Sequence, residues 1–314
     1  MIARTLIVGA SGYNGSNLAR RLALGGHMVR GLVRDRTRAV PGLDDVVTGD
    51  VVTGAGLDRA LDGIDVAFYF VHALDSAEGT DERDIRAAHR FVRAATASGL
   101  ARAVFFTMLA PPPGAEVPRY QRNRLAVERI LRAGLPGMSA LRAGMVLGPG
   151  SRAPLPYLRL VQRAPVLPLG PWRTNRVAVL DAATVTECLY RVGTRDEFAG
   201  RSVDAPASAQ PTHEELVRGL IDVLGLRRRR MIVRTPFDSA RVDARLIATL
   251  TGQSYEFCRY LLSGNRFDYI VDPARAAPFD DITPAPLRDC LLAVAAAPPE
   301  AFRNPSRFPR AVER

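Results

Sequence analysis

The first fifteen residues contain the feature that most constrains the fold of this chain. A short apolar run, residues 6–8, leads directly into Gly9, Gly12 and Gly15, and a helical pattern follows at once. A strand, a glycine-rich turn and a helix in this order form the first unit of a dinucleotide-binding domain. Three glycines also suit a plain structural turn, but their position between a strand and a helix favours a dinucleotide site.

Each glycine has its own physical role in this interpretation. Gly9 lets the chain leave the strand in a tight turn where a Cβ would clash. Gly12 lets the backbone approach a pyrophosphate, and Gly15 lets the helix pack close to the strand. The N-terminus of the helix then offers N–H groups and partial positive charge to the phosphates. The turn predicted to contact the cofactor comprises Gly9, Ser11, Gly12, Tyr13, Asn14 and Gly15.

The composition is that of an ordinary globular protein, with 314 residues, of which 47% are hydrophobic and 24% charged. No apolar stretch approaches the roughly 20 residues of a membrane span, and residue 1 leads directly into a strand. We therefore expect no signal peptide and no membrane partner. Cys188, Cys258 and Cys290 fit neither a disulfide framework nor a zinc site, so we expect no metal and a reducing, cytoplasmic location.

The charged residues are unusual because all 43 basic side chains are arginine and the formal net charge is +11. Because the chain has no lysine, a Schiff-base mechanism through a lysine side chain is excluded. A basic chain can bind nucleic acid, but these arginines are scattered and no nucleic-acid motif is present. The one dense run, residues 227–230, follows a helical segment and is typical of a solvated helix end. We expect no nucleic-acid partner.

Strand and helix patterns alternate through the first half of the chain. Strands are predicted at residues 6–8, 27–33, 46–50, 66–71, 103–107 and 138–142, with helices at 17–24, 57–61, 81–98 and 122–133. This rhythm predicts an α/β fold with a Rossmann-type, doubly wound parallel sheet. From about Pro149 the rhythm loosens. We expect a dinucleotide-binding domain at 1–149 and a smaller, less regular substrate-binding region at 150–314, parts of which, such as residues 177–180, return to the main sheet.

These motifs resemble a known family. Residues 9–15 resemble the glycine motif of extended and atypical short-chain dehydrogenases/reductases, and residues 33–36, Val-Arg-Asp-Arg, resemble their NmrA-like, NAD(P)H-binding branch. Further resemblances at residues 49–51, 120–128, 141–148, 212–216 and 282–284 extend over nearly the whole chain. The resemblance implies an NAD(P)-dependent oxidoreductase, with Asp50 and Val51 near adenine and Ala143 on the strand that passes the nicotinamide. Nothing in these motifs specifies the substrate.

The resemblance also implies catalytic positions. Tyr120 and Arg124 stand where the family has Tyr-x-x-x-Lys, in which the tyrosine exchanges a proton with substrate and the lysine holds the ribose and lowers the pKa of the tyrosine. Arg124 supplies charge and donors, but its fork does not superpose on an ammonium and it does not relay a proton. Tyr120 is therefore either the proton donor or an exposed loop tyrosine before a helix.

Three further residues belong to the strand ends near the expected cofactor crevice. Thr107 ends the fifth strand, where the family often has a serine that orients the substrate carbonyl, but an ordinary β-branched strand residue is an equal reading. Val71 ends the fourth strand and His72 follows it. His72 either contacts the nicotinamide ribose, acts as an acid or base, or is an ordinary polar residue at a strand end.

The second strand carries conflicting signals about the cofactor. An acidic residue about 20 positions beyond the glycines favours NAD, and Asp35 lies there. Arg34 directly follows the apolar strand, however, and is expected to point into the adenosine pocket, where it would pair a 2′-phosphate. Arg36 and Arg38 add positive charge, and Asp35 would face outward because strand residues alternate. We therefore predict NADP, with NAD as the alternative.

Three functions remain open from the sequence. The leading hypothesis is an NADPH-dependent oxidoreductase acting on a small organic carbonyl or activated alkene, with hydride from nicotinamide and the proton from Tyr120. The second is an NADP(H)-binding sensor or regulator of NmrA type without turnover, and the third a non-redox isomerase or cyclase using the same pocket. Fold analogy alone does not choose among them. We expect a small-molecule substrate and a monomer or homodimer.

Overall fold

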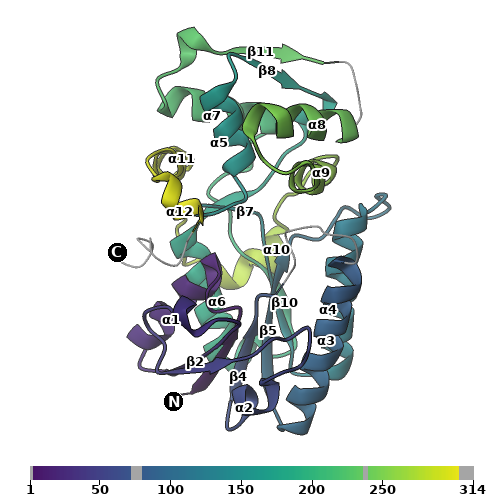
Figure 1. Ribbon diagram of the computed structural model, residues 1–314, viewed down its shortest axis with the longest axis vertical. Helices are drawn as coiled ribbons and strands as arrows, with labels where there is room; N and C mark the ends of the chain where they lie inside the picture. The colour runs from purple at the N-terminus through teal and green to yellow at the C-terminus, as the bar shows by residue number, and fades with distance from the viewer. Residues whose placement is uncertain (1–2, 72–79, 236–239, 304–314) are drawn as a thin grey trace.

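A seven-stranded sheet forms the centre of the lower lobe in Figure 1. The computed structural model describes residues 3–71, 80–235 and 240–303. All neighbouring strands are parallel, in the order β3-β2-β1-β4-β5-β6-β10. The strands are β1 (Arg4–Val8), β2 (Met28–Val33), β3 (Asp45–Thr48), β4 (Val66–Tyr69), β5 (Arg102–Met108), β6 (Ser139–Ala143) and β10 (Ser202–Asp204). The predicted Rossmann-type fold is confirmed, with its topological switch point between β1 and β4.

Helices cover both faces of this sheet. One face carries α1 (Tyr13–Leu24) and α6 (Ala182–Thr194), and the other carries α2 (Leu57–Leu61), α3 (Thr80–Ala97) and α4 (Arg119–Gly134). Side chains of a strand alternate between the two faces. Ile7 therefore packs in the core under α1 and α6, while Leu6 and Val8 pack in the core under α3 and α4. Burial on both faces explains why the strands read as continuous apolar runs.

One expectation about the second half is wrong. Residues 177–180 do not join the main sheet, because β9 (Val179–Asp181) pairs in parallel with β7 (Met145–Leu147) in a separate two-stranded sheet. The chain turns away at Gly144, where a Cβ would lie 2.1 Å from the carbonyl oxygen of Ala178. The place beside β6 is taken instead by β10.

The upper lobe has its own hydrophobic core, which includes Leu160, Val161, Leu216, Leu220 and Leu291. A parallel pair of strands, β8 (Val166–Leu169) and β11 (Met231–Arg234), lies at its top in Figure 1. The remaining elements are α5 (Leu155–Arg163), α7 (His213–Val223), α8 (Ala240–Thr251), α9 (Tyr255–Gly264), α10 (Pro273–Ala276), α11 (Leu287–Ala295) and α12 (Pro299–Arg303), with 3₁₀ turns at Arg36–Arg38, Pro171–Thr174, Asp196–Phe198, Arg227–Arg229 and Ala277–Phe279. None of the helices in the described ranges is both long and apolar enough to traverse a bilayer.

A buried hydrogen-bond network in the upper lobe links α5, the start of α7 and the end of α9. Asn265 Nδ2 donates to the Tyr157 hydroxyl over 2.7 Å, and this hydroxyl lies 3.0 Å from His213 Nδ1. Because burial lowers the pKa of His213 to about 3, the imidazole is neutral and Nδ1 accepts the hydroxyl proton. His213 begins α7, whose N-terminus is closed by a capping box between Thr212 and Glu215. The motif at residues 212–216 therefore has a structural role.

We expect this histidine to make the protein acid-sensitive. The unfolded chain takes up a proton near pH 6.5 that folded His213 accepts only near pH 3, so its stabilising contribution is present above pH 6.5 and is lost as the pH falls. At pH 4.5 the loss is about 2.7 kcal/mol. In urea titrations from pH 7 to 4.5, the free energy of unfolding of His213→Asn should change less with pH than that of the parent, by the uptake of one proton. Replacement of the exposed His89 with asparagine should leave this pH dependence as in the parent. Equal slopes for His213→Asn and the parent would contradict this.

Candidate functional site

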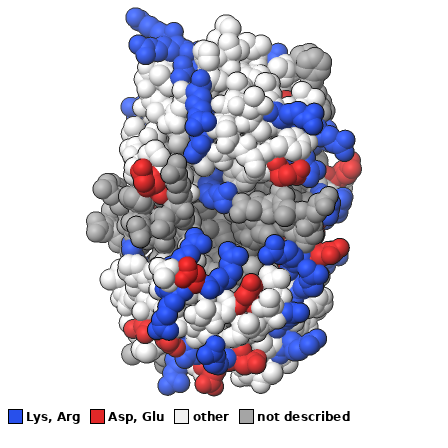
Figure 2. All heavy atoms as spheres, viewed as in Figure 1, with Lys and Arg blue, Asp and Glu red and all other residues white. Residues whose placement is uncertain are grey.

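A cleft of about 680 Å³ lies where the carboxyl ends of the main strands meet the upper lobe. Figure 2 shows basic side chains in both the upper and the lower half of the view. Thirteen predicted site residues line the cleft, namely Gly9, Ser11, Gly12, Tyr13, Asn14, Gly15, Arg34, Asp50, Val51, Val71, Thr107, Arg124 and Ala143. His72 lies outside the described residues. Tyr120 belongs to the first turn of α4 rather than to a loop before it, and its side chain is not among those described.

The glycine turn has the shape of an anion cradle. Gly9 adopts φ +95°, and a Cβ on Gly15 would lie 2.5 Å from the Gly9 carbonyl oxygen, so neither position tolerates a side chain. Gly12 caps α1 without any side-chain cap bond, and the first turn of α1 has no acidic residue. The N–H groups at this helix end are thus available to a phosphate. These features fit the pyrophosphate of a dinucleotide.

The end of the cleft where adenosine is expected carries two arginines. Arg34 and Arg38 line it together with Asp50. Asp35 does not line it, because its carboxylate accepts hydrogen bonds from the Thr37 backbone N–H at 2.9 Å and the Thr37 hydroxyl at 2.7 Å. These bonds hold the pKa of Asp35 below its ordinary value. Asp35 therefore caps the short 3₁₀ turn after β2, and Arg34 and Arg38, not Asp35, line this end of the cleft.

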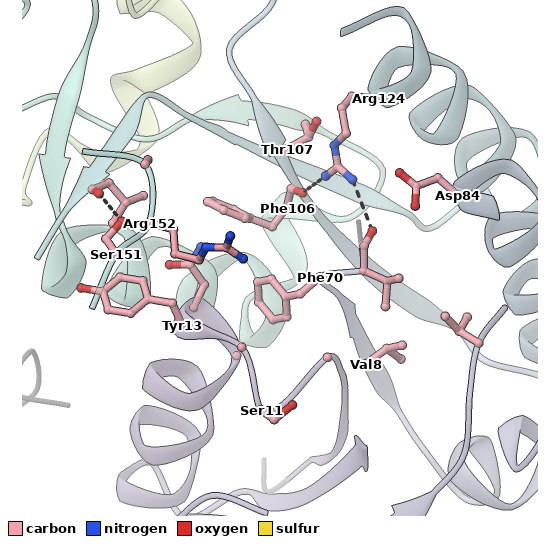
Figure 3. Close-up of a pocket in the computed structure, with 18 of the residues that line it drawn as sticks. Val8, Ser11, Tyr13, Phe70, Asp84, Phe106, Thr107, Arg124, Ser151 and Arg152 are labelled. Atoms are coloured by element: carbon pink, nitrogen blue, oxygen red, sulfur yellow. Dashed lines mark hydrogen bonds between the residues drawn. The ribbon is translucent and has the colours of Figure 1, made fainter. Parts of the chain in front are cut away.

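Arg124 is fixed at the carboxyl edge of the sheet. Its Nη2 donates to the Phe106 carbonyl over 2.7 Å and its Nη1 to the Val71 carbonyl over 3.3 Å, which joins the ends of β4 and β5 (Figure 3). The guanidinium carbon lies 4.6 Å from the centre of the Phe105 ring, and the residue is only 6% exposed. The arginine thus supplies a fixed positive charge, part of whose hydrogen-bonding capacity is used by the backbone.

Sequence reasoning missed an apolar wall of the cleft. Its residues are apolar or aromatic and come from strand ends and from the upper lobe: Phe70, Phe106, Met108, Met145, Val146, Ala153, Phe257 and Phe302. Arg152 also reaches into the cleft (Figure 3), and its guanidinium carbon lies 5.1 Å from the centre of the Phe257 ring. The residues after β7, Gly148 to Arg152, offered a signal, since they form a glycine-containing loop that lines the cleft. Phe257 and Phe302 carry no local signal.

Tyr13 connects the glycine turn to this loop. A Cβ on Gly148 would lie 2.2 Å from the Tyr13 hydroxyl, so the tyrosine packs directly on the glycine backbone. Burial raises the pKa of the Tyr13 phenol well above its ordinary value, and the nearby Asp181 carboxylate adds to the shift. The phenol therefore stays neutral and positions the two sides of the cleft relative to each other.

Comparison with known proteins agrees with this architecture. The sequence profile of the NmrA-like family matches residues 2–134. A protein named ceramide reductase from Caulobacter vibrioides is 33% identical over an alignment of 242 residues, and the match covers 73% of this chain and 73% of the relative. A nucleoside-diphosphate-sugar epimerase from Staphylococcus aureus superposes with a TM-score of 0.73 at 16% identity, over 92% of this chain and 99% of its own. A Thermus thermophilus UDP-glucose 4-epimerase, in complex with NAD, superposes with a TM-score of 0.68 at 14% identity. The match covers 96% of this chain and 99% of the epimerase. The two structures show the fold alone.

Proposed function

The chain belongs to the NmrA-like family of the short-chain dehydrogenase/reductase superfamily, and from this premise we propose that it is an NADPH-dependent reductase of a carbonyl group in a largely apolar substrate. The family is one of NAD(P)-binding oxidoreductase-like and epimerase-like proteins. The proposal adds the direction of the reaction, the cofactor form and the chemistry of the substrate.

One observation carries the proposal. The cleft joins the anion cradle of the glycine turn to a chamber lined by Met108, Met145, Phe257 and Phe302, with Ser151 and Arg152 also in the lining. Such a wall suits hydrocarbon, because burying apolar surface stabilises the bound state by about 25 cal/mol per Å². A nucleotide-sugar needs a dense set of polar partners instead. The relative named ceramide reductase supports a reductase with a lipid-like substrate.

The chain's own residues have distinct parts in the proposed reaction. When bound, NADPH supplies the hydride that adds to the carbonyl carbon. Tyr120 delivers a proton to the carbonyl oxygen, so that carbonyl, hydride and proton give the alcohol. The Thr107 hydroxyl orients that oxygen by a hydrogen bond, and the fixed charge of Arg124 favours the phenolate that Tyr120 becomes. The apolar wall excludes water from the reacting carbon.

The decisive assay offers NADPH with long-chain keto-lipids and, separately, with UDP-sugars. We expect NADPH oxidation with the keto-lipids alone, with one alcohol formed per NADP⁺ released. Tight NADPH binding without turnover on either class would favour a nucleotide sensor. Isomerised product without net NADPH consumption would favour a non-redox isomerase. Either outcome would overturn the reductase proposal.

The sensor is the second candidate because of Arg124. Two of its N–H groups are used by the Phe106 and Val71 carbonyls, so it holds strand ends together whether or not a reaction takes place. A non-catalytic protein that only binds nucleotide needs no more than this.

The cofactor form is tested at Arg34. Charge-assisted hydrogen bonds contribute about 1.5–3 kcal/mol, so Arg34→Ala should weaken NADPH binding by roughly 10- to 100-fold and leave NADH binding unchanged. Arg36→Ala is the matched control, since Arg36 belongs to the neighbouring 3₁₀ turn and does not line the cleft. Parallel calorimetric titrations decide the question. If NADH binds the parent as tightly as NADPH and Arg34→Ala affects neither, the cofactor is NAD.

A further inference from the structure

The parallel pair of β8 and β11 presents an apolar outer face at the top of the upper lobe (Figure 1). Val166 pairs with Met231 and Pro168 with Val233 in the register of the two strands. Val166, Met231 and Val233 are 43%, 58% and 38% exposed, and Pro168 is half-buried. We call these four residues the β8–β11 face. The alternate residues of the pair, such as Leu167, point inward and pack in the core of the lobe.

The two chain segments that contain this face carry only positive charges. Residues 162–170 and 226–235, which contain both strands, include six arginines and no Asp or Glu. Arg227 pairs with Asp222, and Arg234 lies 3.4 Å from Glu214. Arg228 and Arg229 are exposed, and neither has a side-chain partner among the residues that the structure describes. They lie within three residues of Met231.

We propose that the β8–β11 face docks the protein on the surface of an anionic phospholipid bilayer. Apolar side chains beside arginines match the membrane interface, where hydrocarbon lies directly beneath phosphate headgroups. Guanidinium groups pair well with phosphate oxygens. A symmetric contact between two copies of this face would bring the same arginines together, and their repulsion opposes it. This proposal departs from the expectation of no membrane partner, which rested on the lack of a spanning segment; a surface contact needs no such segment.

The inference rests on the proposed function in one respect. A lipid-like substrate resides in the bilayer, and docking would place the enzyme where that substrate is found. The docking itself can be measured without turnover, so the two proposals fail separately. Bilayer binding without reductase activity would leave the docking intact, and reductase activity without bilayer binding would leave the proposed function intact.

The test is flotation of the full-length protein with vesicles of phosphatidylcholine alone or mixed with phosphatidylglycerol. We expect binding only to the mixed vesicles, and its loss in high salt. Arg228→Glu combined with Arg229→Glu should reduce the bound fraction by at least about tenfold. Met231→Ser should reduce it less, because it removes apolar surface and leaves the charges.

Two control variants separate a specific surface from general basicity. Arg90→Glu combined with Arg93→Glu makes the same change in net charge on exposed positions of α3 in the lower lobe. Leu24→Glu changes an apolar residue that is 72% exposed at the end of α1. Both should bind vesicles like the parent, and circular dichroism should show all variants folded. Failure of the parent to bind, or equal loss in the α3 variant, overturns the proposal. So does a parent dimer that Met231→Ser converts to monomer, since the face would then join two copies.

Discussion

Replacing Tyr120 with phenylalanine is expected to lower the rate of carbonyl reduction by about 10²–10⁴-fold while NADPH affinity is kept. The change removes one hydroxyl at the start of α4, one helical turn before Arg124, and with it the proposed proton donor. Single-turnover oxidation of bound NADPH measures the effect, since it separates the chemical step from product release. The loss should also remove the pH dependence that the phenol contributes to the rate.

The control for this variant is Tyr190→Phe. Tyr190 lies on α6, where its ring stacks 3.6 Å from the Arg21 guanidinium, and it does not line the cleft. Its replacement should leave the rate unchanged. Unchanged turnover in Tyr120→Phe as well would show that the proton comes from water, and would remove Tyr120 from the proposed mechanism.

Replacing Gly12 with valine should reduce NADPH affinity by at least about 100-fold, or about 2.7 kcal/mol. A Cβ at this position would lie 3.2 Å from the Gly9 carbonyl oxygen, a tight contact that a small shift relieves. The fold should therefore survive, while the branched side chain occupies the space that the pyrophosphate needs. Calorimetric titration measures the affinity, and thermal unfolding without cofactor checks the fold.

Two companion variants make this result specific. Ala23→Val adds the same branching at an exposed position of α1 and should bind NADPH like the parent. Gly15→Ala should destabilise the fold itself, because its Cβ would lie 2.5 Å from a backbone oxygen that has no freedom to move away. Parent-like NADPH affinity in Gly12→Val would mean that the pyrophosphate does not approach the turn at this glycine.

Local sequence patterns were sufficient for β1 to β6 and for α1 to α4, but not for α6 and β10, which complete the lower lobe. The glycine turn and its flanking strand and helix are contiguous, so their geometry follows from residues close together in the chain. Parallel order follows from strands that alternate with helices, because right-handed crossovers leave few alternatives. The strand ends and the family resemblance together directed Arg34, Thr107 and Arg124 to one edge of the sheet, and all three line the cleft. Their roles in binding and catalysis stay predictions.

The long-range pairings had no such local signature. Residues 177–180 read as a strand, but a strand pattern does not name its partner, and the close approach of Gly144 to Ala178 directs β9 to β7. Arg124 stands at a family position, yet its bonds to Phe106 and Val71 depend on how α4 packs on the sheet. The start of α4 at Arg119 was also missed, since the helix was predicted to begin at residue 122.

The sequence by itself therefore determined the fold class, the dinucleotide turn and the edge of the sheet where the site lies, because each depends on neighbours within a few dozen residues. Only the tertiary structure decided the character of the substrate chamber and the outer surface of the upper lobe. Phe257 and Phe302 reach the cleft from α9 and α12, and Val166 meets Met231 across 65 positions of sequence. Contacts of that kind arise from the packing of whole elements, and no periodicity within one element encodes them.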